Sequence, residues 1–338
     1  MSGAPSPQEI VSEAGWLLQA LDPTGELVRL VEMDREAYRS ASFLDDRMFQ
    51  TPRNSQIGRW SEIVEAIPAD ARRDARWIFH IGHVGSTLVA RLLGELDGIL
   101  SIREPRILRD VAGVPKERMS SYTEPLKALL SRTFDPSELA LVKATSFVSE
   151  IAPDLIEPGT HAIFMYAAPR AYIQGILAGD NSRQELRVLA PSRAARLAPR
   201  VPTLARADGN EAELAAIAWA CEMTSLEAAA IADPEARIAW ADFDVMLTDM
   251  ETHLAEAAAH LGLRADAQRI ASLANGPLMG RYSKALEYEY SPNLRRELLA
   301  EADGFHGRDI DSAMAMLIRA AEDAPLLASA LRRAKAES

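Results

Sequence analysis

Residues 76–88 read Arg-Trp-Ile-Phe-His-Ile-Gly-His-Val-Gly-Ser-Thr-Leu. The first six residues, 76–81, are a compact apolar run of the kind that forms a buried β-strand, and the run ends at Gly82. From Leu88 to Leu96 the apolar residues recur at helical spacing. The stretch therefore predicts a strand, a tight loop and a helix in immediate succession.

The loop between this strand and this helix has the composition of an anion site. Its small residues allow backbone N–H groups to turn inward, and Ser86 and Thr87 add hydroxyl donors. The helix that follows offers its free N–H groups and the positive end of its dipole. It is not a Walker A loop, because it contains no lysine. The simpler alternative is that the Gly-Ser-Thr sequence only caps the start of the helix and binds no ligand. We predict that a phosphate-bearing nucleotide contacts Gly82, Val84, Gly85, Ser86, Thr87 and Leu88.

The rest of the chain alternates between predicted strands and helices. Further strands are expected at 99–102, 139–142, 162–166 and 236–240. Helices are expected at 170–178, 211–232 and 248–261, with alanine-rich helices after residue 309. This alternation predicts an α/β fold with a central parallel sheet flanked by helices. Ligands of such sheets bind beyond the carboxyl ends of the strands.

The chain divides into three predicted parts. Residues 1–75 form an N-terminal extension, with a disordered start at 1–12, a hairpin at 16–33, a helix at 59–66 and no evident chemistry. Residues 76–300 form the main domain, and 301–338 form C-terminal helices packed on it. Residues 182–206 are rich in arginine, alanine and proline, which predicts a mobile surface segment or a lid over the site.

Composition restricts the function classes. The 338 residues are 48% hydrophobic with a net charge of −12, and this acidic balance argues against nucleic acid as the main partner. The one cysteine, Cys221, excludes a disulfide framework and fits a reducing compartment. The N-terminus lacks a signal-peptide core, and no run of about 18 apolar residues predicts a membrane span. We expect a cytoplasmic protein. The histidines show no metal-ligand spacing, so no metal is expected.

The loop resembles the 5′-phosphosulfate loop of the sulfotransferases, a family that uses 3′-phosphoadenosine 5′-phosphosulfate. Gly85, Ser86 and Thr87 match the last three positions of that loop, whereas His83 stands where the family has lysine or arginine and Val84 where it has serine. Further resemblances follow in the family's order over residues 76–300. They lie at 103–105 (a second-strand motif), 167–171 (the start of the 3′-phosphate motif), 241–244 (an acidic segment before a helix) and 276–284 (a late basic loop). The resemblance implies a P-loop-containing nucleotide hydrolase fold of the sulfotransferase type.

The resemblance also implies roles for single residues. Glu104 would be the general base that takes a proton from the acceptor. His83, with a side-chain pKa ordinarily near neutrality, could take that proton or stabilise the transferred group. Lys143 ends an apolar strand, where a point charge suits a phosphoryl or sulfuryl oxygen. His80 is expected to be a packed core residue. The implied reaction is sulfuryl transfer to a hydroxyl or amine of a small-molecule or peptide acceptor.

Two positions depart from the family's pattern. Its 3′-phosphate site uses an arginine and a serine, and these positions are Ala167 and Gly175 here. Neither side chain can bind phosphate. Either other basic residues replace them, or the donor is not the usual one. The candidates are Arg170, Arg183, Arg281 and Lys284, of which Arg170, Arg281 and Lys284 are the predicted nucleotide contacts.

Two other functions remain open at this stage. A small-molecule kinase on the same fold would turn over ATP with magnesium. A nucleotide-binding protein without catalysis would bind its ligand and show no turnover. The fold alone does not choose among the three, since one fold hosts many functions, and the sequence predicts neither the acceptor nor the oligomeric state.

Overall fold

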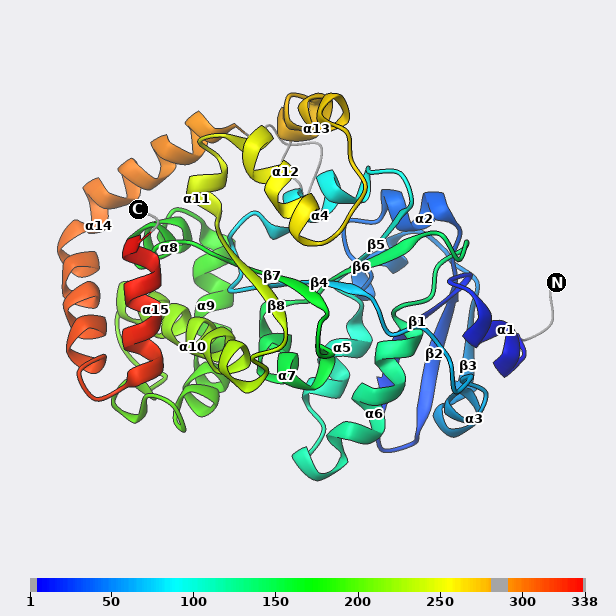
Figure 1. Ribbon diagram of the computed structural model, residues 1–338. Coiled ribbons are helices and arrows are strands. Elements are labelled where there is room, and N and C mark those ends of the chain that lie inside the picture. Colours follow the sequence, from blue (N-terminus) through cyan, green and yellow to red (C-terminus); the bar gives the residue numbers. More distant parts are fainter. Residues whose placement is uncertain (1–4, 281–290, 337–338) are drawn as a thin grey trace.

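The computed structural model describes residues 5–280 and 291–336. Its centre is a five-stranded parallel sheet in the order β5-β6-β4-β7-β8 (Figure 1). Strands β4 to β7 are buried along most of their length, as expected for a sheet covered by helices on both faces. The predicted fold class and all five predicted strands are confirmed. The strands are β4 (Arg76–His80), β5 (Ile99–Arg103), β6 (Leu139–Lys143), β7 (His161–Tyr166) and β8 (Arg237–Asp242).

The strand order creates a crevice at one edge of this sheet. The connection that leaves β4 passes over β6 to reach β5, whereas the connection that leaves β6 crosses β4 to reach β7. The two connections therefore leave the neighbouring strands β4 and β6 in opposite directions across the sheet. Such a switch point leaves an opening beyond the carboxyl ends of the strands, where ligands of open α/β sheets bind.

Helices cover both faces of the sheet (Figure 1). One face carries α4 (Ser86–Gly94), α12 (Met250–His260) and α13 (Ala267–Ala274). The opposite face carries α5 (Arg106–Ala112), α6 (Lys116–Leu129) and α7 (Ala152–Leu155). The shorter connecting elements are η2 (Ser146–Ile151), α8 (Pro169–Leu177), α11 (Phe243–Met246) and η4 (Pro277–Gly280).

The N-terminal extension is a second, antiparallel sheet that shares the main core. The predicted hairpin is confirmed, and a third strand that the sequence analysis missed completes the sheet in the order β1-β2-β3. The predicted disorder is wrong at residues 7–12, because Ser6 and Glu9 form a capping box that starts a helix there. Side chains of this sheet join one hydrophobic cluster with the main domain. The elements are α1 (Pro7–Ser12), β1 (Trp16–Asp22), β2 (Leu27–Glu32), α2 (Arg35–Ser40), η1 (Asp46–Gln50), β3 (Ser55–Arg59) and α3 (Trp60–Glu65).

Residues 182–206 are not the mobile segment that their composition predicts. They belong mostly to an 18-residue helix, α9 (Asp180–Leu197), and to a short turn, η3 (Pro202–Leu204). The arginines explain the difference. Arg196 donates to Glu222 at 2.8 Å, and Arg200 donates to Glu150 at 2.7 Å, which fastens the segment to neighbouring helices.

The C-terminal helices run across the predicted domain boundary. α14 (Pro292–Ala320) continues through residue 300, so the chain has no break there. α15 (Pro325–Ala336) follows, as the alanine-rich pattern predicts. The first described helix, α1, and the last, α15, lie on opposite sides of the molecule (Figure 1).

α10 (Glu211–Ala232) lies among the helices α8, α9, α14 and α15, and its bounds match the prediction. By length and mean hydropathy, 1.3 over its most apolar window, it could also cross a membrane. However, 83% of that window is buried, and the helix contacts α8, α9, α14 and α15. Its apolar composition is therefore accounted for by packing inside the fold.

Candidate functional site

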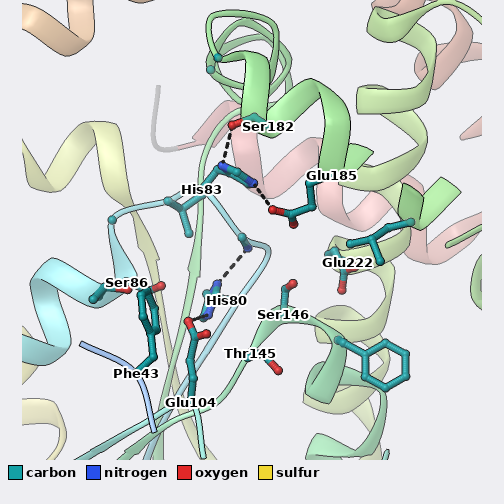
Figure 2. Close-up of a pocket in the computed structure, with 18 of the residues that line it drawn as sticks. Phe43, His80, His83, Ser86, Glu104, Thr145, Ser146, Ser182, Glu185 and Glu222 are labelled. Atoms are coloured by element: carbon teal, nitrogen blue, oxygen red, sulfur yellow. Dashed lines mark hydrogen bonds and ion pairs between the residues drawn. The ribbon is translucent and has the colours of Figure 1, made fainter. Parts of the chain in front are cut away.

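A cavity of about 910 Å³ opens at the carboxyl ends of the parallel strands. Its walls come from the loop after β4, the ends of β5 and β6, the segment before η1, and the helices α8, α9, α10 and α14. All six residues of the predicted anion site line it (Gly82, Val84, Gly85, Ser86, Thr87 and Leu88). So do the three predicted catalytic residues, Glu104, His83 and Lys143. Figure 2 shows how the polar residues converge on this space.

Gly85 fixes the shape of the loop. It is the N-cap of α4 and has a left-handed backbone, with φ of 61°. A Cβ atom at this position would meet the ring of Phe243 at 2.0 Å, so no side chain fits. The tight turn places the first N–H groups of α4 at the cavity, which is the arrangement that binds anions at helix N-termini.

Two buried threonine hydroxyls support the prediction that an anion binds at this loop. Within the described part of the chain, Thr87 Oγ1 and Thr145 Oγ1 are buried without a hydrogen-bond partner, and both residues line the cavity. Thr87 is only 2% exposed. Because leaving a buried hydroxyl unpaired costs about 1–3 kcal/mol, such atoms are expected to serve a ligand.

Lys143 and Glu104 form an ion pair at the floor of the cavity. Lys143 Nζ donates to Glu104 Oε1, and Arg47 Nη2 donates to the other oxygen at 3.2 Å. Lys143 is 1% exposed and Glu104 8% exposed, so water screens the pair weakly. Glu104 also has a left-handed backbone, with φ of 51°, which is costly for a residue with a side chain. Strain of this kind gathers at functional sites.

His80 connects the loop to this ion pair. Its Nδ1 accepts from the Gly82 N–H at 2.9 Å, so Nε2 carries the proton and donates to the Ala144 carbonyl at 2.9 Å. The same Nε2 lies 4.0 Å from Glu104 Oε1. His80 is buried, as the sequence predicts, and it also lines the cavity. Its two hydrogen bonds position the loop against β6.

His83 lies at the opposite wall, close to α9 (Figure 2). Its Nδ1 lies 3.5 Å from Ser182 Oγ, and its Nε2 lies 3.8 Å from Glu185 Oε2. The backbone of His83 is left-handed, with φ of 56°. The structure thus brings His83 to the cavity, where its side chain contacts residues of α9.

The N-terminal extension contributes residues that the sequence analysis missed. Phe43, Asp45 and Arg47 line the cavity, although the extension was expected to carry no chemistry. The Arg47 guanidinium lies 3.3 Å from the centre of the Phe43 ring and donates to both Asp45 oxygens. Burial favours the neutral carboxyl of Asp45, but the hydrogen bonds and charge of Arg47 outweigh it and lower its pKa.

Two of the solved structures that match this chain are sulfotransferases. No protein-family model matches it, and no curated protein matches it significantly. A solved sulfotransferase domain from the curacin biosynthetic pathway is 13% identical with a TM-score of 0.43, and the match covers 70% of this chain and 91% of that one. The mouse sulfotransferase SULT7A1, solved in complex with PAP, is 14% identical with a TM-score of 0.34, over 73% and 89% of the two chains.

Arg170 is not brought to the cavity. Its guanidinium donates to Asp303 at 2.6 Å and to Asp311, and it thereby fastens α14 to α8. Arg183, the other described candidate, pairs with Asp180 and Glu211 and does not line the cavity either. The predicted contacts Arg281 and Lys284 lie outside the described residues.

The two departures from the sulfotransferase pattern have different surroundings. Ala167 is fully buried, and its carbonyl accepts from Trp219 Nε1 at 2.9 Å. Gly175 lines the cavity, and a Cβ there would lie 3.9 Å from Nη1 of Arg295. Arg295 is therefore a cation at this end of the cavity, and the sequence analysis did not single it out.

Arg295 is held firmly in place. It donates to both oxygens of Asp244, at 2.6 and 3.0 Å, and its guanidinium lies 5.2 Å from the centre of the Phe243 ring. Asp244 lies in α11, so these hydrogen bonds join α14 to α11. No local sequence pattern indicates a role for Arg295, because its partner Asp244 lies 51 positions earlier in the chain.

The arginines next to Glu104 support the fold. Arg103 is 2% exposed and donates to the carbonyl oxygens of Tyr38 and Ala41, and burial lowers its pKa to about 9. Arg106 donates to Asp46 at 2.5 Å. Neither lines the cavity. Among residues 5–280 and 291–336, no group of three or more His, Cys, Asp or Glu side chains is arranged to hold a metal ion.

Proposed function

We propose that the protein transfers a sulfuryl group from 3′-phosphoadenosine 5′-phosphosulfate to a hydroxyl or amine of an acceptor. One observation carries the proposal. One cavity brings together a helix N-terminus shaped by Gly85, two buried threonine hydroxyls that lack a partner in the described part of the chain, and a buried lysine–glutamate pair. The helix N-terminus and the threonine hydroxyls suit a phosphosulfate anion. The lysine–glutamate pair suits a transfer in which negative charge shifts to the leaving group while the acceptor loses a proton.

The residues present fit the phosphosulfate end of this donor, which supplies an activated sulfuryl group. Gly85 allows close approach of the backbone, and the first N–H groups of α4 face the anion. Thr87 and Thr145, whose buried hydroxyls have no hydrogen-bond partner among the described residues, would each donate a hydrogen bond to it. Lys143 adds a buried positive charge on the same side. Donors fixed in a site of low polarity stabilise developing charge strongly.

Glu104 is the group that we assign to the acceptor proton. Its two oxygens accept from Lys143 and Arg47, yet an ionised carboxylate has about four lone-pair sites, so an acceptor hydroxyl can also be bound. As that hydroxyl attacks, Glu104 takes its proton. His83 also lines the cavity, and we assign it to contact with the transferred group or the acceptor.

For the 3′-phosphate of the donor, we propose that Arg295 replaces the arginine and the serine of the sulfotransferase pattern. We expect Arg295→Gln to weaken binding of 3′-phosphoadenosine 5′-phosphate about tenfold or more, the loss typical of one charge-assisted hydrogen bond. Binding of AMP, which lacks the 3′-phosphate, should change less than twofold. Isothermal titration calorimetry measures both constants. Arg170→Gln is the matched control and should change neither, whereas equal losses for both nucleotides in Arg295→Gln would remove Arg295 from 3′-phosphate recognition.

Transfer itself is tested with ³⁵S-labelled 3′-phosphoadenosine 5′-phosphosulfate and a panel of alcohols, phenols and amines. The proposal expects labelled product without added magnesium. Labelled product from γ-³²P-ATP and magnesium instead would identify a small-molecule kinase. Nucleotide binding without product from either donor would identify a binding protein.

A further inference from the structure

A buried arginine of the cavity lacks a hydrogen-bond partner within the described part of the chain. Arg193, on α9, lines the cavity and is only 5% exposed. No described residue accepts a hydrogen bond from its buried Nε, and Glu222 Oε1 lies 3.8 Å from that atom, beyond hydrogen-bonding distance. Because a buried charge without hydrogen bonds is costly, this guanidinium is expected to serve a ligand.

Two glutamates lie beside the arginines of α9, and other arginines occupy both of them. Arg196 donates to the two oxygens of Glu222, at 2.9 and 2.8 Å. Arg200 donates to the two oxygens of Glu150, at 2.8 and 2.7 Å. Together with Arg193, these residues form what we call the α9 charge cluster. Its three arginines face two glutamates, which leaves one positive charge in excess, at Arg193.

The α9 charge cluster is separate from the residues that we assign to the donor's 3′-phosphate. Arg196 lies over the ring of Phe147 at 4.9 Å, and Phe147 belongs to η2, which follows β6. Arg295 pairs instead with Asp244, which follows β8. Strands β6 and β8 lie on opposite sides of β4 in the sheet. The cluster and Arg295 are therefore attached to strand ends on opposite sides of the loop after β4.

A short segment connects the α9 charge cluster with the reactive pair. Residues 143–147 start at the partner of Glu104 and end at the aromatic ring that contacts the cluster. They span at most about 14 Å. In Figure 2, Ser146 lies between Glu104 and Glu222. A small acceptor whose hydroxyl lies at Glu104 can therefore place its other end at Arg193.

We propose that Arg193 binds a carboxylate of the acceptor, so that the protein acts on small hydroxy acids. The inference rests on the proposed function. The acceptor hydroxyl forms a bond to sulfur while the bond from sulfur to the donor's phosphate oxygen breaks, Glu104 takes the proton, and 3′-phosphoadenosine 5′-phosphate leaves.

The chemistry of Arg193 favours a carboxylate over other anions. Its planar guanidinium offers N–H groups in a fork that matches the two oxygens of a carboxylate. The single positive charge in excess is balanced by a monoanion. A phosphate dianion would bring a second negative charge close to Glu222, which is 1% exposed and therefore weakly screened.

The test compares ω-hydroxy acids with their primary amides as acceptors, with transfer of ³⁵S-sulfate as the readout. The amide keeps nearly the same shape but carries no charge. We expect kcat/KM of the best acid to exceed that of its amide about tenfold or more, as is typical of one charge-assisted hydrogen bond. Arg193→Met should abolish this preference. Arg187→Gln is the matched control and should keep it, because Arg187 is also an arginine of α9 but does not line this cavity.

Urea unfolding distinguishes a binding role of Arg193 from a structural one. Nε of Arg193 has no hydrogen-bond partner among the described residues, so Arg193→Met should keep the unfolding midpoint at or above that of the wild type. Arg196→Met breaks the bidentate pair with Glu222 and should lower the midpoint. A midpoint that falls as far in Arg193→Met as in Arg196→Met would make Arg193 a structural partner of Glu222 and overturn the inference.

Binding of a carboxylate alone separates this inference from the transfer reaction. Hexanoate and hexanamide are titrated calorimetrically into the wild-type, Arg193→Met and Arg295→Gln proteins. Tighter binding of hexanoate that is lost in Arg193→Met but kept in Arg295→Gln supports the carboxylate site even if no acceptor is turned over, in which case only the transfer proposal fails. Equal affinities for hexanoate and hexanamide, or a preference for the acid that persists in Arg193→Met, would show that Arg193 binds no carboxylate.

Discussion

Replacing Glu104 by glutamine is expected to lower the rate of sulfuryl transfer about a hundredfold or more, whereas the affinity for 3′-phosphoadenosine 5′-phosphate persists. A positioned general base contributes about 10²- to 10⁴-fold to a rate, and glutamine cannot accept the proton. The nucleotide affinity persists because its proposed contacts come from the loop, the start of α4, Thr145, Lys143 and Arg295, and not from the carboxylate. Steady-state rates together with calorimetric titration of the nucleotide separate the two effects.

The control for this variant concerns folding. Glu104→Gln removes the carboxylate that pairs with Lys143, which is 1% exposed, and breaking a buried pair costs of the order of 3 kcal/mol. The double variant Glu104→Gln with Lys143→Met removes both charges and should recover most of that stability in urea unfolding. Transfer should remain lost in the double variant. A Glu104→Gln protein with wild-type rates would show that another group, with His83 the first candidate, takes the proton.

Gly85→Ala is expected to damage both the fold and the site. The new Cβ would meet the Phe243 ring at 2.0 Å, and alanine disfavours the left-handed backbone at φ of 61°. Overpacking and the backbone cost together should lower the free energy of unfolding by about 3 kcal/mol. Nucleotide affinity should fall more than tenfold, because the shifted loop no longer directs its N–H groups at the anion. Urea unfolding and calorimetry measure the two losses.

Gly98→Ala is the matched control for this substitution. Gly98 also has a left-handed backbone, with φ of 76°, but no atom lies within 4 Å of a Cβ built there. It should lose only the backbone cost of about 1–2 kcal/mol and keep its nucleotide affinity. In the Gly85→Ala background, Phe243→Leu should restore part of the stability by relieving the clash. If Gly85→Ala binds nucleotide as tightly as Gly98→Ala does, the loop is not the anion site.

The elements that carry the loop could be predicted because their signals are local. The apolar run at residues 76–81, the glycines after it and the helical spacing from Leu88 all lie within about one strand and one helix. The carboxyl ends of parallel strands share one edge of the sheet, so Glu104 and Lys143 could be placed at the same cavity from strand ends alone. The structure adds that these two side chains pair with each other.

The remaining residues of the site depend on contacts between distant parts of the chain. Arg47 reaches Glu104 across 57 positions and Arg295 reaches Asp244 across 51, and neither spacing leaves a periodic trace in the sequence. The prediction of a mobile segment at residues 182–206 is wrong for the same reason. Its arginines look like a solvated surface until Glu150 and Glu222 are placed beside them by the fold.

The most direct test is thermal unfolding of the wild-type protein in the presence of single nucleotides. The panel holds 3′-phosphoadenosine 5′-phosphate, AMP, ADP and ATP, each with and without magnesium. A ligand at a hundred times its dissociation constant stabilises the folded state by about 2.7 kcal/mol, which is measurable. We expect 3′-phosphoadenosine 5′-phosphate to raise the unfolding temperature most, and to do so without magnesium. Stabilisation only by ATP or ADP with magnesium, or no stabilisation by any of the four, would contradict it.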